Sequence, residues 1–248
     1  MRNEPVVRVE KLIWRGRGLS RLESGKVIII EPGVFPGERV KLGMIQEKRD
    51  YLQAVCTKII EPHPRRRPHP CPYAHACGGC LFGVIPNRVQ LDLKKELLSA
   101  ELFRALPDYP EAAKVPVEVF PSPRGWRYRW RGQIHVHASR PHFKKMNSHE
   151  LVPLKDCLLL ARPLGQGLSR ICRGLPDGKQ TIAAGPLQGR PVSGLDGQTV
   201  RLPFPAYQMQ LKVSAGSFFQ ANWLLNQDLT AYVTSCLAGF GRVADLYA

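Results

Sequence analysis

Three cysteines, Cys71, Cys77 and Cys80, lie within ten residues, and this spacing constrains the fold more than any other feature of the sequence. Gly78 and Gly79 stand between the last two, and glycine permits positive φ angles and close approach of backbone amides to a buried anionic centre. Sites with four sulfur ligands select zinc or an iron–sulfur cluster, and spacing alone does not separate the two. The segment therefore predicts a metal or cluster site that needs a fourth ligand. The candidates are Cys56, Cys157, Cys172 and Cys236, with His69 and His75 as nearby nitrogen donors.

The alternative interpretation of the cysteines is that they are buried thiols. It fits Cys56, Cys172 and Cys236, which stand singly in apolar stretches. Disulfides are not expected, because the first residues carry charges throughout and form no secretory signal. No apolar run approaches the roughly 20 residues that cross a bilayer. The sequence therefore predicts a cytoplasmic protein without a membrane segment.

The chain is strongly basic. Its 248 residues carry 36 Lys and Arg against 20 Asp and Glu, a formal net charge of +16. The excess is spread along the chain, with concentrations at residues 65–67, 124–131 and 144–145. Such a surface is typical of proteins that bind a phosphate backbone, because each neutralised phosphate releases counterions. The alternative is a basic soluble protein that has no polyanionic partner.

The first part of the chain, residues 1–61, reads as a small β-barrel. Short β-rich runs at residues 6–9, 27–30, 38–42 and 52–60 are separated by glycine-rich breaks, including residues 16–18. Four or five strands at this spacing predict an OB-like barrel, a common platform for nucleic acids. The proline-rich segment 62–70 excludes helix and central strand, and we interpret it as a domain boundary.

The rest of the chain alternates between helical and extended patterns, so the predicted fold class is mixed α/β with several domains. A helix is expected over residues 86–106, ended by Pro107, and another over residues 223–237. Strands are expected at residues 115–120, 133–137 and 150–154, and again after the turn at residues 239–241. We predict a central α+β domain over residues 62–210 with an antiparallel sheet. Residues 162–205 are rich in glycine and proline and predict only turns and short strands.

Basic and aromatic residues alternate just before the second expected strand. Arg127, Arg129 and Arg131 alternate with Trp126, Tyr128 and Trp130. In an extended segment the three arginines share one face, so they are candidates for RNA contact through phosphates, with the aromatic rings free to stack on bases. The alternative is a strand whose aromatic side chains are core and whose arginines are solvated.

Several segments together resemble one family, the RNA uracil-5 methyltransferases of ribosomal and transfer RNA that carry a TRAM domain and a four-iron, four-sulfur cluster. The resemblance lies in residues 35–40 (FPGERV), 67–80 (RPHPCPYAHACGGC), 89–94 (VQLDLK), 125–131 (GWRYRWR) and 148–157 (SHELVPLKDC). It implies that residues 1–61 are the TRAM domain. It also implies that Cys157 joins Cys71, Cys77 and Cys80 around a 4Fe-4S cluster, for which we expect a structural role.

Two further matches concern the methyl donor. Residues 217–222 (SFFQAN) resemble the family motif whose glutamine contacts S-adenosylmethionine, which implies that role for Gln220. Residues 243–247 (VADLY) resemble the first strand of the methyltransferase fold, which implies that Tyr247 lines the cofactor site. Residues 211–248 are then the beginning of the methyltransferase domain. Core packing is the alternative for Phe218, Phe219 and Tyr247.

The match to the family stops short of its reaction chemistry. The family attacks C6 of the uracil with a thiolate, transfers a methyl group to C5 and removes a proton. None of the seven cysteines matches the nucleophile, and Cys236 is only the nearest by position, so no catalytic residue is assigned. We expect a C-terminally truncated portion that recognises RNA and carries the cluster but does not methylate alone, with a separate chain as one source of the missing half. The alternatives are a non-catalytic RNA-binding iron–sulfur module and a zinc-binding structural protein.

Overall fold

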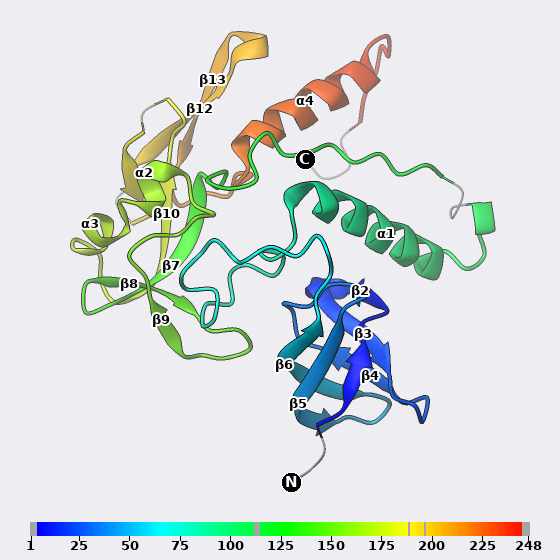
Figure 1. Ribbon diagram of the computed structural model, residues 1–248. Helices are drawn as coiled ribbons and strands as arrows, with labels where there is room; N and C mark the ends of the chain where they lie inside the picture. Colours follow the sequence, from blue (N-terminus) through cyan, green and yellow to red (C-terminus); the bar gives the residue numbers. More distant parts are fainter. Residues whose placement is uncertain (1–3, 112–114, 188, 196, 245–248) are drawn as a thin grey trace. The chain divides into compact units, whose positions relative to one another are not determined.

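The structure is a computed structural model that describes residues 4–111, 115–187, 189–195 and 197–244 (Figure 1). The chain divides into two compact units between Pro121 and Ser122. Among the described residues, no helix combines the length and apolar character needed to cross a bilayer.

The first unit begins with a closed sheet. Its strands are β1 (Val6–Arg8), β2 (Lys11–Ile13), β3 (Arg17–Arg21), β4 (Val27–Ile30), β5 (Arg39–Glu47) and β6 (Leu52–Glu61), in the order β1-β5-β6-β4-β3-β2. Only Val9 and Glu10 separate β1 from β2, yet these two strands stand at opposite ends of the order, so the sheet closes into a barrel. All pairs are antiparallel except β4 with β6.

Alternating burial explains the barrel strands. Ile28 and Ile30 in β4 and Val40 and Leu42 in β5 are fully buried and form the barrel core, as expected for strands with one face turned inward. Gly18 was predicted to lie in a break between strands, but it lies inside β3. A Cβ at this position would stand 2.7 Å from Val34 Cγ2, so close packing rather than a turn requires the glycine. The sequence pattern therefore missed β2 and β3.

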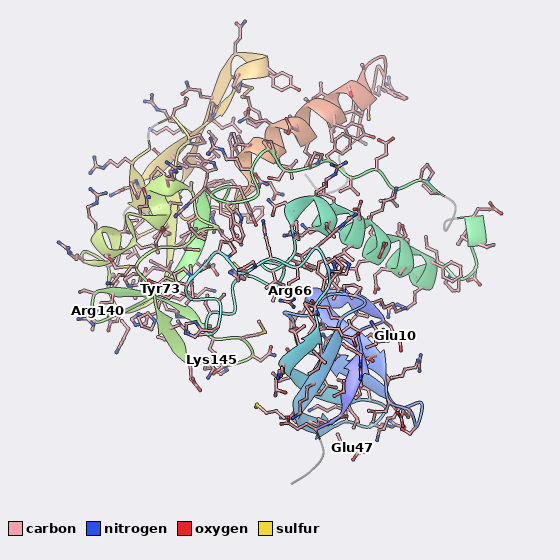
Figure 2. All side chains as sticks on the ribbon, in the orientation of Figure 1. Glu10, Glu47, Arg66, Tyr73, Arg140 and Lys145 are labelled. Carbon is pink, nitrogen blue, oxygen red and sulfur yellow. The ribbon has the colours of Figure 1, made fainter. Side chains whose placement is uncertain are left out.

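The proline-rich segment 62–70 packs on the barrel, which differs from the expected division at residue 61. The His63 ring stacks on Phe35 with centroids 3.8 Å apart. Arg66, labelled in Figure 2, forms an ion pair with the buried Glu38. Further on, helix α1 (Asn87–Ala105) buries Leu93 in a cluster with Leu12, Phe35 and Ile85. The helix predicted at residues 86–106 is confirmed. The proline-rich segment and α1 therefore belong to the same unit as the barrel, and this unit runs to Pro121.

The strand predicted at residues 115–120 is wrong. The described residues there form no regular element, and Val115, Val119 and Phe120 are exposed. An apolar run pairs as a strand only where a neighbouring edge accepts its backbone hydrogen bonds.

The second unit contains an antiparallel sheet. Its strands are β7 (Arg131–His137), β8 (Arg140–Lys144), β9 (Leu151–Pro153), β10 (Gly178–Ala184) and β11 (Pro191–Ser193), in the order β11-β10-β7-β8-β9. Two short helices that the sequence pattern missed, α2 (Arg162–Gly165) and α3 (Leu168–Cys172), bury Leu164 and Leu168 against Ile134 and Ile182 of the sheet.

A hairpin and a helix complete this unit. Strands β12 (Thr199–Phe204) and β13 (Met209–Ser214) pair with each other, and α4 (Trp223–Leu237) follows, as its sequence pattern predicts. Trp223 anchors α4, since its indole N–H donates to Pro203 O at 3.0 Å and its ring packs on Phe204. Of the strand expected after residue 241, residues 242–244 form no strand and residues 245–248 lie outside the described residues.

Candidate functional site

The cysteine segment of the first unit is a series of tight turns. The backbone N–H of Ala74 donates to Cys71 O at 3.2 Å, and the N–H groups of Ala76 and Cys77 both donate to Tyr73 O, at 3.0 and 2.8 Å. Cys71, Cys77 and Cys80 are all half-buried. Such turns hold three thiols in a short piece of chain, as the spacing predicts.

One backbone amide approaches a sulfur of the segment, as the glycines predicted. The Gly79 N–H donates to the Cys77 sulfur. Burial raises the pKa of the Cys77 thiol, and the nearby Cys71 thiol adds to the rise, while the Gly79 amide opposes it. Before the segment, the Cys71 N–H donates to His69 Nδ1 at 3.0 Å.

His69 is packed over Gly83. A Cβ on Gly83 would lie 1.8 Å from His69 Nε2, so only glycine leaves room for the ring. The imidazole is therefore fixed in place, and its Nδ1 is occupied by the Cys71 amide. Burial lowers the pKa of His69, so the ring is neutral at pH 7.

Cys157 lies in the second unit, next to a half-buried ion pair. Asp156 receives the Arg127 guanidinium in a bidentate contact of 2.7 and 2.5 Å, and Arg127 Nη1 also donates to Cys157 O at 3.0 Å. The hydrogen bond from Arg127 is the main reason that the pKa of Asp156 lies below its ordinary value. A Cβ on Gly165 would lie 2.4 Å from Arg127 Nη1 and 2.7 Å from Cys157 O, so this glycine makes the arrangement possible.

The four cysteines predicted as ligands are thus divided between two units, three in the first and Cys157 in the second. Among the described residues, no three His, Cys, Asp or Glu side chains stand together in a geometry that holds a metal ion. The donor types suit a cluster or zinc, since three soft sulfurs and an amide donor share one segment. The predicted ligand set stays a prediction.

The common face predicted for the three arginines is wrong. Arg127 has φ +60°, which interrupts the extended backbone, and its guanidinium is committed to Asp156. Strand β7 begins only at Arg131, and Trp130 is buried in the core of the second unit. The alternative interpretation, in which the aromatic is core, therefore holds for Trp130.

The other two arginines are better placed for a ligand. Arg129 is exposed, while its backbone is fixed by a bond from its N–H to Leu159 O at 2.9 Å. Arg131 is half-buried, its Nε donates to Ser217 O at 3.0 Å, and its guanidinium lies 5.8 Å from the centroid of the exposed Phe218 ring. Contact of either arginine with RNA stays a prediction.

Of the two residues predicted to bind the methyl donor, the structure describes Gln220, which lies just before helix α4. Gln220 is exposed and lies three residues before the first residue of the helix, Trp223. Asn222 caps the helix by accepting from the Leu225 N–H at 3.4 Å, and its amide donates to Ser122 Oγ at 2.8 Å. Tyr247 lies outside the described residues.

Sequence reasoning did not single out Asp156, Gly165, Asn222 or the Glu38–Arg66 pair. Each acts through contacts with residues far along the chain, and only Asn222 carries a local signal, as an N-cap residue before an apolar helical run.

Comparison with known proteins identifies relatives. An "Uncharacterized RNA methyltransferase" of Aquifex aeolicus is 36% identical over 161 residues, which are 64% of this chain and 36% of the relative. The "23S rRNA (uracil(1939)-C(5))-methyltransferase RlmD" of Dichelobacter nodosus is 34% identical over 172 residues, which are 68% of this chain and 39% of the relative. This chain is homologous to RNA methyltransferases, including 23S rRNA (uracil-C(5))-methyltransferases. No protein-family model matches it.

A solved structure shows the same fold. The crystal structure of a Pyrococcus abyssi tRNA (uracil-54, C5)-methyltransferase in complex with S-adenosyl-L-homocysteine superposes with a TM-score of 0.65 at 15% identity, and covers 94% of this chain and 65% of that chain. The mixed α/β fold with several sheets is thus shared with an RNA uracil-5 methyltransferase. The matches to the Aquifex and Dichelobacter relatives span 36% and 39% of their lengths, a little over a third.

Proposed function

We propose that this chain is the RNA-recognising part of an enzyme that methylates uridine C5 in RNA with S-adenosylmethionine. The observation that carries the proposal is the homology to 23S rRNA uracil-5 methyltransferases over about two thirds of the chain. The net charge of +16 supports it, because RNA is a polyanion. The barrel of β1–β6 supplies an OB-like platform of the kind expected of a TRAM domain. Such an enzyme acts in the cytoplasm.

The second part of the proposal is a 4Fe-4S cluster held by Cys71, Cys77, Cys80 and Cys157. Its support is the donor chemistry and the Gly79 amide directed at a sulfur. When bound, the cluster contributes folding free energy by tying the cysteine segment to the segment around Cys157. Zinc in place of iron would make the site structural in the same way, and metal analysis separates the two.

The third part concerns the methyl donor and the reaction. Gln220 and Tyr247 are proposed to contact S-adenosylmethionine, and Arg129 and Arg131 to contact RNA phosphates. Since none of the seven cysteines matches the nucleophile, a separate segment or chain is proposed to supply it.

RNA binding by the purified chain tests the proposal. We expect tight binding of an rRNA fragment that contains uridine 1939, with an affinity that falls steeply as salt rises. A tRNA fragment that contains uridine 54 serves as the competing substrate, and an acidic polypeptide as the control polyanion. Binding no tighter to RNA than to the acidic polypeptide would contradict the proposal.

A further inference from the structure

An apolar cavity lies in the first unit between the barrel and helix α1. Its volume is about 350 Å³, within the size range of ligand sites. It lies between the turn that joins β2 to β3 and the helix, which runs past this end of the barrel (Figure 1). Phe82, Leu97 and Leu98 line it, and Leu98 remains 49% exposed.

Trp14 stands at the edge of this cavity with 68% of its surface exposed. Large aromatic side chains are seldom left this accessible without a partner, because an indole buries much apolar area when covered. The backbone next to Trp14 is also held in an uncommon conformation, with φ +64° at Arg15 and +69° at Gly16. Left-handed backbone in a residue other than glycine costs free energy and gathers at binding sites.

The turn that carries Trp14 packs closely against the cavity lining. A Cβ on Gly16 would lie 3.2 Å from two atoms of the Phe82 ring, so the backbone at Gly16 is in close contact with this ring. Arg17 Nε donates to Trp14 O at 3.4 Å. Trp14 is thus presented from a fixed backbone.

The charges at the rim favour an anion. Arg15 and Lys94 line the cavity, and both are exposed. Among the described residues that line it, the single acid is Glu101, whose carboxylate forms an ion pair with Arg104 one turn along α1. Aromatic and apolar walls with a cationic rim are the combination that binds unstacked nucleotides, since bases stack on rings and phosphates contact cations.

We propose that this cavity binds one unstacked nucleotide of single-stranded RNA, with its base stacked on Trp14 and its phosphates near Arg15 and Lys94. This inference rests on the proposed RNA binding and adds a second point of contact, separate from Arg129 and Arg131. Because a paired base must first break its pairing and unstack before it can enter the cavity, the site favours single strands over duplexes.

Trp14→Ala in the full chain tests the inference with a labelled short oligouridylate and a duplex RNA of equal length. We expect the variant to bind the oligouridylate about tenfold more weakly, from the loss of one stacked base. Duplex binding is expected to stay unchanged, and Trp14→Phe to keep most of the affinity. The matched control is Tyr109→Ala, because Tyr109 is 67% exposed in the same unit but does not line the cavity.

The outcomes separate the inference from the proposed function. If the wild-type chain binds neither RNA, the proposed function fails and the inference fails with it. If the wild-type chain binds RNA and Trp14→Ala binds as Tyr109→Ala does, the inference alone is overturned. An equal loss for duplex and single strand also overturns it. Leu98→Glu places a negative charge in the cavity and gives an independent check, with the same preferential loss of single-strand binding expected.

Discussion

Glu38 is an acidic residue of the first unit whose side chain is fully buried. Its carboxylate accepts from Arg66 Nε at 2.6 Å, from Phe35 N–H at 2.8 Å and from His63 N–H at 3.1 Å. Burial by itself raises the pKa of Glu38, but these hydrogen bonds outweigh it and hold the pKa below its ordinary value. The motif at residues 35–40 therefore contains a structural anion that fastens the segment after the barrel to the barrel itself.

Arg66→Met is expected to destabilise the protein by about 3–5 kcal/mol, because it leaves the buried Glu38 charge without its cation. Arg65→Met is the matched control, since Arg65 is an exposed neighbour of the same type and should change stability by less than about 0.5 kcal/mol. Urea unfolding at neutral pH measures both. Equal stabilities of the two variants would show that the pair does not hold the segment.

The same carboxylate gives stability a defined dependence on pH. Because the folded pKa of Glu38 is depressed, the unfolded chain takes up a proton at about its ordinary pKa of 4.5 while the folded chain does not. This contribution is fully present above that pH and is lost as the pH falls towards the depressed folded value. We expect unfolding midpoints to decline below about pH 4.5, and less steeply in Glu38→Gln. Parallel declines in the two proteins would assign the effect to other carboxylates.

At the scale of elements, the local sequence was sufficient to predict a helix or strand where that element depends mainly on its own residues. Helices α1 and α4 follow from apolar spacing and their terminal signals, and β4 from consecutive β-branched residues. Strand β3 and helices α2 and α3 were not predictable, because Gly18 and Gly165 serve close contacts with distant residues rather than turns. Residues 115–120 have the sequence pattern of a strand, but in the part of the chain that the structure describes they pair with no neighbouring strand.

Asn222→Ala is expected to destabilise the second unit by about 1 kcal/mol, because it removes the acceptor that caps α4. Asn222→Asp keeps an acceptor oxygen and should retain most of the stability. Thermal unfolding followed by circular dichroism compares the two variants. If alanine and aspartate prove equally stable, the contact with the Leu225 N–H does not support the helix.

At the scale of the whole molecule, the candidate site was visible from sequence only in its local part. The spacing of Cys71, Cys77 and Cys80 is contained in one segment, so the turns and half-buried thiols follow from it. The Arg127 position was misjudged because alternation in sequence does not reveal a positive φ angle or a partner such as Asp156. Whether Cys157 binds the same cluster as the other three cysteines depends on how the two units are arranged, and the spacing of cysteines in the sequence carries no information about that arrangement.

Cysteine substitution tests that joining directly. We expect the chain purified without oxygen to contain iron and acid-labile sulfide with a visible charge-transfer band. Cys77→Ser and Cys157→Ser should each lose most of the iron and unfold at lower denaturant, because the bound cluster contributes folding free energy.

Two other cysteines supply the controls for this experiment. Cys172→Ala should keep the iron, since burial raises the pKa of this thiol to about 11 and keeps it a neutral core group. Cys236→Ser should keep it as well, because the thiol is exposed on α4. Iron retained in Cys157→Ser but lost in Cys77→Ser would confine the site to the first unit and require a different fourth ligand. Zinc without sulfide would replace the cluster with a metal site built on the same thiolates.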